Sequence, residues 1–160
     1  MSAGEREVLT WQGYGDASRE LAQMVVDSGF MPDVVVAIAR GGLPVGAAIS
    51  YALGTKGVGT MNVEFYTDID ERLPAPIVLP PLLDTAYMKG LKVLIADDVA
   101  DTGETLALVK ALMAEHAGEV RTVTLYAKSH SIIEPDYVWK RTDQWITFPW
   151  SALPPVMRSA

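Results

Sequence analysis

The sequence predicts an α/β protein in which a mostly parallel central sheet is flanked by helices. Apolar runs typical of buried strands lie at 33–39, 59–65 and 93–96, and segments with helical periodicity lie between and after them. Strands that alternate with helices favour a parallel sheet with helices on both faces. The chain has 160 residues, 49% of them hydrophobic, which is enough for one core. We therefore expect a single domain over residues 1–160.

The first half of the chain predicts two helices and two strands. Asp16 is a suitable cap for a helix that runs to residue 29. The buried strand 33–39 follows it, then a helix of small residues at 45–54 and a second strand at 59–65. This order places the segment Arg40-Gly41 at the carboxyl end of the first buried strand, where parallel sheets bind ligands.

The segment from residue 66 to residue 89 differs from the rest of the chain. Charged residues at 68 and 70–72 are followed by four prolines among apolar residues. Proline at this density disfavours pairing with a neighbouring strand, so we expect an irregular, flexible loop. Loops of this length are uncommon in a domain unless they have a function.

The second half of the chain predicts a strand at 93–96, a helix at 106–116 and a strand at 120–127. The chain then becomes irregular from residue 129, with short strand candidates at 137–139 and 145–148. We find no internal repeat.

Composition excludes several classes of protein. The formal net charge of -7 disfavours nucleic-acid binding, which depends on lysine and arginine. The absence of cysteine excludes disulfides, thiolate nucleophiles and cysteine-zinc sites. No apolar run approaches the ~20 residues of a membrane span, and the N-terminus lacks the apolar core of a signal peptide. We expect a cytoplasmic protein without a membrane span.

The segment Val93–Leu106, VLIADDVADTGETL, carries the strongest functional signal. An apolar strand leads into Asp97, Asp98 and Asp101, and Thr102–Thr105 then opens a helix. A helix start presents free N–H groups and a positive dipole end, which suit a phosphate, whereas carboxylates would repel one. The combination fits a ligand with a phosphate, sugar hydroxyls and a magnesium-bound polyanion. The alternative is a plain strand-turn-helix in which these side chains only cap the helix.

This segment closely resembles the phosphoribosyl-pyrophosphate motif of the type I phosphoribosyltransferases. The resemblance implies the fold of that family, with a small hood formed from the two ends of the chain. It also implies a loop at about 66–89 that closes over the site and a base-binding hood at about 129–155. Members of the family are commonly dimers or tetramers, so a homo-oligomer is expected.

The resemblance implies roles for individual residues. Asp97 and Asp98 match the acidic pair that binds the ribose and supports Mg²⁺, with Asp98 the preferred metal ligand, and Asp101 is the candidate catalytic acid–base. The residues that match positions binding the donor substrate or its product are Arg40, Gly41, Arg72, Asp97, Asp98, Asp101, Thr102, Gly103, Glu104 and Thr105. Arg40 and Arg72 have the alternative of being ordinary solvated arginines.

The base end is similar to the xanthine-guanine branch of the family. There Lys128 is expected to donate to the 6-keto oxygen of a purine, Trp145 to stack on the base, and Ile146 to contact it through its backbone. Packing in the core is the alternative for the tryptophan. Thr147 and Ser151 stand where that branch has acidic residues, which leaves the preferred purine and a second metal contact open.

The sequence therefore predicts transfer of a phosphoribosyl group from phosphoribosyl pyrophosphate to a 6-oxopurine, with Mg²⁺ as cofactor. Two rivals are a non-catalytic regulator that binds the donor or a nucleotide on the same fold, and an enzyme for another base. The two histidines, His116 and His130, are assigned no role.

Overall fold

One six-stranded sheet forms the centre of the computed structural model, which describes residues 4–66, 72–78 and 86–159, with the backbone alone described at 64–66 and 72–78. The strand order is β4-β3-β2-β5-β6-β7, and each neighbouring pair is parallel except β3 with β4. The strands are β2 (Val34–Ala39), β3 (Gly57–Tyr66), β4 (Arg72–Val78), β5 (Lys92–Ala100), β6 (Glu119–Ala127) and β7 (Tyr137–Arg141). The predicted mostly parallel sheet is confirmed.

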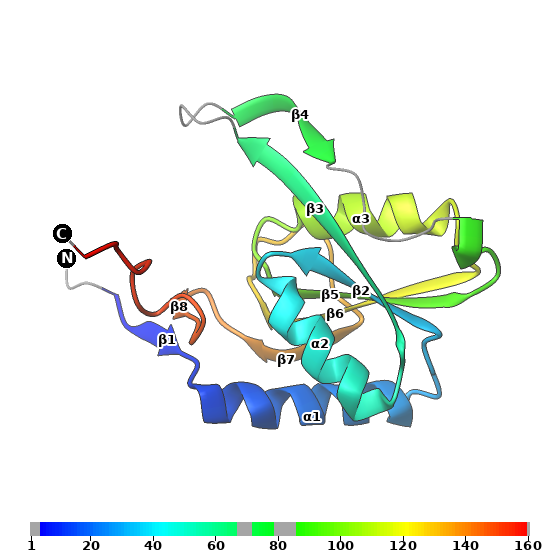
Figure 1. Cartoon of the computed structure of the whole chain (residues 1–160), viewed down its shortest axis with the longest axis horizontal. Helices are drawn as coiled ribbons and strands as arrows, with labels where there is room; N and C mark the ends of the chain where they lie inside the picture. The colour runs from blue at the N-terminus through cyan, green and yellow to red at the C-terminus, as the bar shows by residue number, and fades with distance from the viewer. Residues whose placement is uncertain (1–3, 67–71, 79–85, 160) are drawn as a thin grey trace.

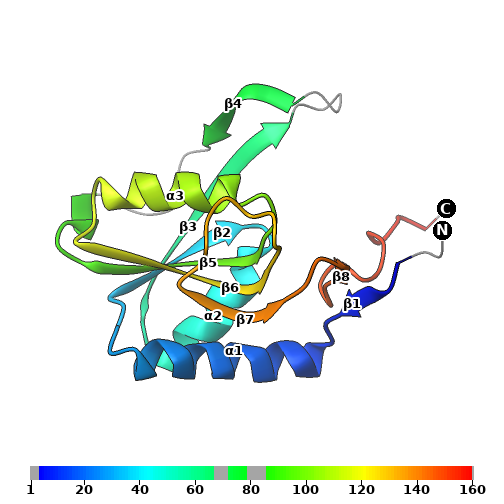
Figure 2. The same ribbon diagram turned by 180° about the vertical axis from the view of Figure 1, so that it is seen from behind.

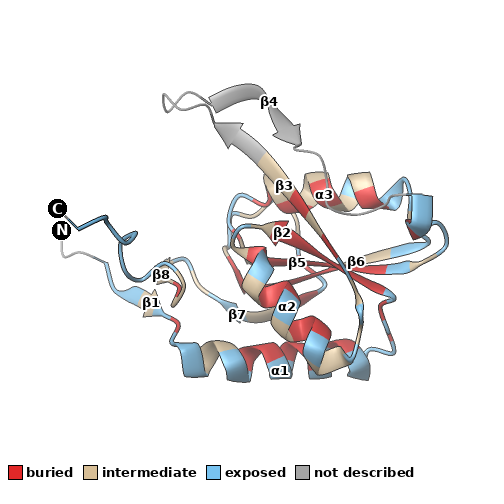
Figure 3. Ribbon diagram, in the orientation of Figure 1, coloured by how far each residue is buried: buried red, intermediate tan, exposed pale blue. Residues whose placement is uncertain are grey.

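Helices cover both faces of this sheet (Figures 1 and 2). Helices α1 (Trp11–Asp27) and α2 (Gly42–Leu53) pack on one face, and α3 (Glu104–Ala114) packs on the other. A 3₁₀ turn, η1 (Ala86–Met88), precedes β5. The central strands are buried from both sides, as Figure 3 shows, which explains their continuous apolar sequences. No helix in the described ranges is long and apolar enough to cross a membrane.

A second, two-stranded sheet joins the two ends of the chain. Strand β1 (Arg6–Val8) pairs in parallel with β8 (Trp145–Thr147) beside the main sheet (Figure 1). The Glu7 carboxylate anchors this sheet to the body, because it accepts hydrogen bonds from Lys140 Nζ at 2.8 Å and from the Tyr126 hydroxyl at 3.2 Å. We call this unit the hood. Its C-terminal strand was predicted, whereas β1 was not.

The predicted start of the first helix is wrong. Helix α1 begins at Trp11, and Thr10 is its N-cap, with its hydroxyl oxygen accepting from the Gly13 N–H at 3.0 Å. Asp16 lies inside the helix and not at its end. Threonine caps helices well, so the helix starts six residues earlier than expected, with Thr10 rather than Asp16 as its cap.

The prediction of an irregular loop over 66–89 is wrong for its middle part. Residues Arg72–Val78 form strand β4, antiparallel to β3, although the strand contains Pro74 and Pro76. Because β4 is at the edge of the sheet, a proline without an N–H does not interrupt pairing with a second neighbour. The charged positions at 68, 70 and 71 lie outside the described residues.

Strand β5 is longer than the apolar run predicted. It continues to Ala100 and therefore contains Asp97 and Asp98. Its pairing with β2 ends at Ala96, while its pairing with β6 continues to Ala100. The acidic pair thus occupies the stretch of β5 that is no longer paired with β2. This leaves room beside it for the loop that follows β2.

Candidate active site

Two loops predicted independently meet at the carboxyl edge of the sheet. The loop after β2 packs so closely on β5 that a Cβ on Gly41 would lie 2.1 Å from Asp98 Oδ2. A Cβ on Gly42 would lie 2.4 Å from the carbonyl oxygen of Ala96. Both glycines are therefore required for space at this contact. The structure brings the Arg40-Gly41 segment and the acidic pair together, as the sequence predicted.

The Arg40-Gly41 loop opens onto a pocket. The peptide bond between Ala39 and Arg40 is cis. Arg40, Gly41, Asp98 and Trp150 are among the residues that line a pocket of about 550 Å³. Arg40 is exposed and makes no ion pair with any described residue. The pocket therefore offers a free guanidinium beside a carboxylate.

Asp97 and Asp98 line different pockets, as expected for successive residues on a strand, whose side chains alternate between faces. Asp97 lines the pocket at the start of α3, whereas Asp98 lines the pocket at Arg40. Asp97 Oδ1 accepts from the Asp98 N–H at 2.9 Å, and Asp98 Oδ1 accepts from the Val99 N–H at 2.8 Å. Each carboxylate therefore keeps an oxygen for a ligand.

Burial perturbs both acids. Burial raises the pKa of Asp97 well above the ordinary carboxyl value, and the negative charge of Asp98 raises it further. Burial also raises the pKa of Asp98. Neither carboxylate has a Lys, Arg or His ion-pair partner among the described residues. A cation or hydroxyl groups of a ligand would relieve this unfavourable concentration of negative charge.

A small pocket lies at the N-terminus of α3. It has a volume of about 90 Å³ and is lined by Asp97, Val99, Asp101, Thr102, Gly103, Thr105 and Leu106. Gly103 has φ of 82°, and a Cβ there would lie 2.4 Å from Ser131 Oγ. Glycine is thus required for both conformation and space. Glu104 does not line this pocket, and its N–H donates to Thr102 Oγ1 at 3.3 Å.

Asp101 lies between two pockets and has an unpredicted partner. It lines both the small pocket at α3 and a larger one under the hood. Its Oδ1 is 2.7 Å from Nε2 of His130, a residue to which the sequence assigned no role. The two residues are 29 positions apart in the chain. No motif spacing could have found this contact.

The larger pocket contains all three predicted base-binding residues. It measures about 340 Å³, and Lys128, Trp145 and Ile146 line it. Lys128 Nζ donates to the backbone oxygen of Gln144, and an ammonium keeps further donors for a ligand. Trp145 is 72% exposed, so packing in the core does not explain it.

Arg6 was missed by the sequence interpretation. It lines the same pocket and is paired with Trp145 in the register of β1 with β8, so the two side chains lie on the same face of the hood. Thr147 and Ser151, which replace expected acidic residues, line this pocket as well. The pocket therefore contains two cationic side chains, Arg6 and Lys128, and one carboxylate, Asp101.

Trp150 serves the hood mainly by packing. Its ring stacks on Phe148 at 5.0 Å between centroids and meets Tyr14 edge-to-face at 5.5 Å. Arg72 begins strand β4, but its side chain lies outside the described residues, so its predicted role stays a prediction.

The side-chain oxygen atoms at the site could supply some, but not all, of the ligands of a magnesium ion. Among the residues described there is no group of three or more His, Cys, Asp or Glu side chains that could hold a metal ion. Two adjacent carboxylates on β5 are hard oxygen ligands of the kind that Mg²⁺ prefers, and this ion commonly takes its other ligands from water and substrate phosphates. The donor set therefore fits a metal that arrives with its substrate.

Comparisons with known proteins agree with this site. The sequence profile described as a phosphoribosyl transferase domain matches residues 5–154. A xanthine-guanine phosphoribosyltransferase from Ruegeria sp. (strain TM1040) is 31% identical over 153 residues, which cover 89% of this chain and 83% of that protein. Another of the same name from Idiomarina loihiensis is 29% identical over 144 residues, covering 89% and 84%.

Solved structures show the same fold. A purine phosphoribosyltransferase from Pyrococcus horikoshii Ot3 superposes with a TM-score of 0.81 and 32% identity, covering 98% of this chain and 100% of that one. A xanthine-guanine-hypoxanthine phosphoribosyltransferase from Helicobacter pylori gives a TM-score of 0.75 at 23% identity, covering 92% and 94%, and supports the fold alone.

Proposed function

Because the chain belongs to the phosphoribosyl transferase family, we propose that it transfers the phosphoribosyl group of phosphoribosyl pyrophosphate to a 6-oxopurine. Guanine, hypoxanthine and xanthine are the candidate bases, and the products are the nucleoside monophosphate and pyrophosphate. The observation that carries the proposal is the place of Asp101, which lines both the small pocket at α3 and the pocket under the hood. A nucleotide whose phosphate and base occupy these two pockets has its ribose beside Asp101.

The small pocket at α3 suits the 5′-phosphate. Thr102 and Thr105 supply hydroxyl donors there, and the first turn of α3 supplies backbone N–H groups. Glu104 does not line the pocket, so its expected role in binding the donor stays a prediction. A volume of about 90 Å³ suits a group of phosphate size but not a base.

The acidic pair suits the ribose and the metal. In this proposal Asp97 accepts from ribose hydroxyls, and Asp98, beside the Arg40-Gly41 loop, is the preferred contact for Mg²⁺. When bound, Mg²⁺ would offset the negative charge of the departing pyrophosphate. Arg40 and the backbone of Gly41 would donate to its phosphate oxygens.

The pocket under the hood suits the purine. Lys128 can donate but cannot accept, which favours a 6-keto oxygen over a 6-amino group. Trp145 offers an exposed ring on which a base can stack, an interaction worth ~1–3 kcal/mol per base. The relatives named as a xanthine-guanine and a purine phosphoribosyltransferase support a purine as the base.

The chemistry requires one proton transfer besides the substitution at the sugar. The bond from C1 of the ribose to pyrophosphate breaks, its electron pair leaves with pyrophosphate, and a purine nitrogen forms the new bond to C1. The proton of the purine imidazole ring moves to a carboxylate oxygen of Asp101. Exclusion of water matters because the positively charged sugar would otherwise be hydrolysed.

The direct test is turnover with a panel of bases. The protein is incubated with phosphoribosyl pyrophosphate, Mg²⁺ and guanine, hypoxanthine, xanthine, adenine, uracil or orotate, and pyrophosphate release is measured. Release with one or more 6-oxopurines is expected. Donor binding without release for any base would instead support the non-catalytic regulator, and turnover only with uracil or orotate would reject the roles of Lys128 and Trp145.

Substitution of Asp101 tests its proposed role as the catalytic acid–base. We expect Asp101→Ala to lower kcat by about 10²–10⁴-fold, the usual contribution of a general acid–base, while donor affinity changes far less. Equal losses in turnover and donor affinity would mean that Asp101 only positions the segment Asp101–Thr105, which we call the phosphate loop. Omission of Mg²⁺, with a chelator present, tests the metal in the same assay and should abolish release.

The expected cytoplasmic location and homo-oligomeric state belong to this proposal as well. The family resemblance supports both. Sedimentation analysis of the full chain tests the second, and a monomer at assay concentrations would contradict it.

A further inference from the structure

His130 contacts the proposed acid–base of the site. Its Nε2 lies 2.7 Å from Asp101 Oδ1, a hydrogen-bond distance. Both side chains are more than half exposed, 58% for His130 and 64% for Asp101. An exposed pair of this kind contributes little to folding stability. The contact therefore needs an explanation other than stability.

The segment that carries His130 is fixed on both sides. On the side of the phosphate loop, the Ile132 N–H donates to the carbonyl oxygen of Thr102 at 2.8 Å. On the side of the hood, the N–H and hydroxyl of Ser129 donate to the two carboxylate oxygens of Asp143, each at 2.8 Å. Bonds on either side of His130 thus hold it between the loop before α3 and the segment that leads into β8.

We propose that His130 is a positioning residue for Asp101, whose Oδ1 it holds so that Oδ2 is the oxygen that takes the proton of the purine. This inference rests on the proposed function and extends it to a residue outside the family motif. A carboxylate with one oxygen held by a donor has less freedom to rotate, so its second oxygen spends more time in the reactive orientation.

With Nε2 as the donor, the hydrogen bond occupies Oδ1 of Asp101 and leaves Oδ2 to accept the proton of the purine. Asp143, which holds Ser129, is the other carboxylate whose charge interacts with the ring of His130.

Three variants test the proposal in the assay described above, with the 6-oxopurine that gives the fastest turnover. His130→Ala removes the donor. His130→Gln keeps an N–H donor at about the position of Nε2 but does not ionise. His116→Ala is the matched control, because His116 is an exposed histidine outside the pockets described. For each, kcat and the KM of both substrates are measured from pH 5.5 to 9, and thermal unfolding confirms folding.

The expected results separate positioning from a structural role. His130→Ala should lower kcat about 10-fold at pH 8 with the donor KM within about 2-fold of wild type. His130→Gln should recover most of that loss, because it keeps the N–H donor. His116→Ala should behave as wild type.

Two outcomes overturn the inference. If His130→Ala has the kcat of His116→Ala at every pH, the contact has no role in turnover. If it raises the donor KM and leaves kcat unchanged, His130 supports the phosphate loop rather than the acid–base. Absence of pyrophosphate release from wild type with all bases is a different result, which rejects the proposed function itself.

Discussion

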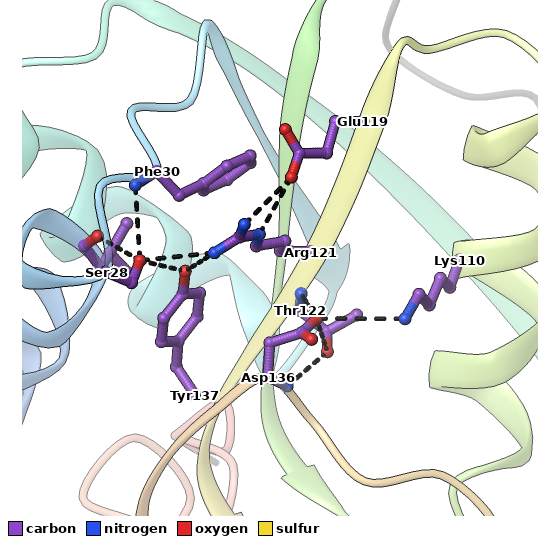
Figure 4. A network of polar contacts seen from close by, with 9 residues as sticks. Ser28, Phe30, Lys110, Glu119, Arg121, Thr122, Asp136 and Tyr137 are labelled. Atoms are coloured by element: carbon purple, nitrogen blue, oxygen red, sulfur yellow. Dashed lines mark hydrogen bonds and ion pairs between the residues drawn. The ribbon is translucent and has the colours of Figure 1, made fainter.

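The amino and carboxyl ends of the central strands differ in whether their acidic side chains have partners within the fold. At the amino end of β6 each acid has a partner: Arg121 donates to Glu119 Oε1 at 3.2 and 3.1 Å, and to the Tyr137 hydroxyl at 2.9 Å (Figure 4). Asp136 accepts from the N–H and the hydroxyl of Thr122 at 2.8 and 3.2 Å. These contacts tie β6 to β7, and Arg121 also donates to the Ser28 hydroxyl at the end of α1 at 3.4 Å.

At the carboxyl end, two acids are more buried and yet have no cationic partner among the described side chains. Asp97 and Asp98 each accept a hydrogen bond from a backbone N–H group, and burial raises the pKa of both. An arrangement that serves stability satisfies its charges internally, as the amino end does. The carboxyl end instead leaves charge to be satisfied by a ligand, which is typical of a functional site.

Of the predictions that follow from this comparison, the one with the largest effect concerns the close packing of Gly41 at the carboxyl end. Gly41→Ala places a methyl group within 2.1 Å of Asp98 Oδ2, so the loop or the carboxylate must move. Because misplacement of about 1 Å can cost 10²-fold in rate, we expect kcat to fall by about 10²-fold. Gly15→Ala in α1 is the control, since a Cβ there meets nothing within 4 Å. Equal activity of the two variants would show that the loop does not take part in turnover.

Isosteric substitutions at the two ends should change stability in opposite directions. Asp136→Asn weakens charge-assisted bonds to Thr122, so we expect a loss of about 1 kcal/mol. Asp97→Asn removes a buried charge without a partner and keeps an oxygen for the Asp98 N–H, so a gain on the order of 1 kcal/mol is expected. For a chain of this size 1 kcal/mol corresponds to about 2–4 °C in Tm.

The same pair of variants tests whether the gain in stability has a functional cost. Asp97→Asn should unfold at a higher temperature and turn over more slowly, whereas Asp136→Asn should unfold earlier and keep its kcat. A loss of stability in Asp97→Asn would mean that this carboxylate is satisfied within the fold, and the contrast between the two ends would disappear.

The pH dependence of stability follows from the raised pKa values. Because the folded state holds the protons of Asp97 and Asp98 more tightly than the unfolded chain does, their contribution to stability is fully present below the ordinary carboxyl pKa of ~3.9 and is lost as the pH rises through the folded-state values. The free energy of unfolding of wild type, minus that of Asp97→Asn, should therefore become more negative from pH 4 upward. A difference that does not vary with pH would contradict the raised pKa of Asp97.

The sequence predicted the carboxyl end of β5 and the start of α3 better than the rest of the site, for a physical reason. The motif residues follow one another over 97–105, so a local pattern was sufficient to place them at the end of a strand and the start of a helix. Strand β4 was missed because it contains prolines, which a strand accommodates only at the edge of a sheet. Its position at the edge cannot be read from the local sequence. The contact of His130 with Asp101 and the place of Arg6 depend on long-range packing in the same way.

Substitution of Arg6 should have the smallest effect on turnover, and it tests how the base pocket selects among purines. Its guanidinium has no hydrogen-bond or ion-pair partner within the described ranges, and it shares a pocket with Lys128 and Trp145. An unpaired cation there should favour bases with more keto oxygens, because it donates and cannot accept. We expect Arg6→Ala to lower kcat/KM for xanthine by several-fold, about the worth of one hydrogen bond, and to change that for hypoxanthine less. The test measures kcat/KM for xanthine and for hypoxanthine in Arg6→Ala, with Arg19→Ala, on the exposed side of α1, as the control. An equal change for the two bases would show that Arg6 has only a structural role in the hood. The selection of purines would then rest on Lys128 alone.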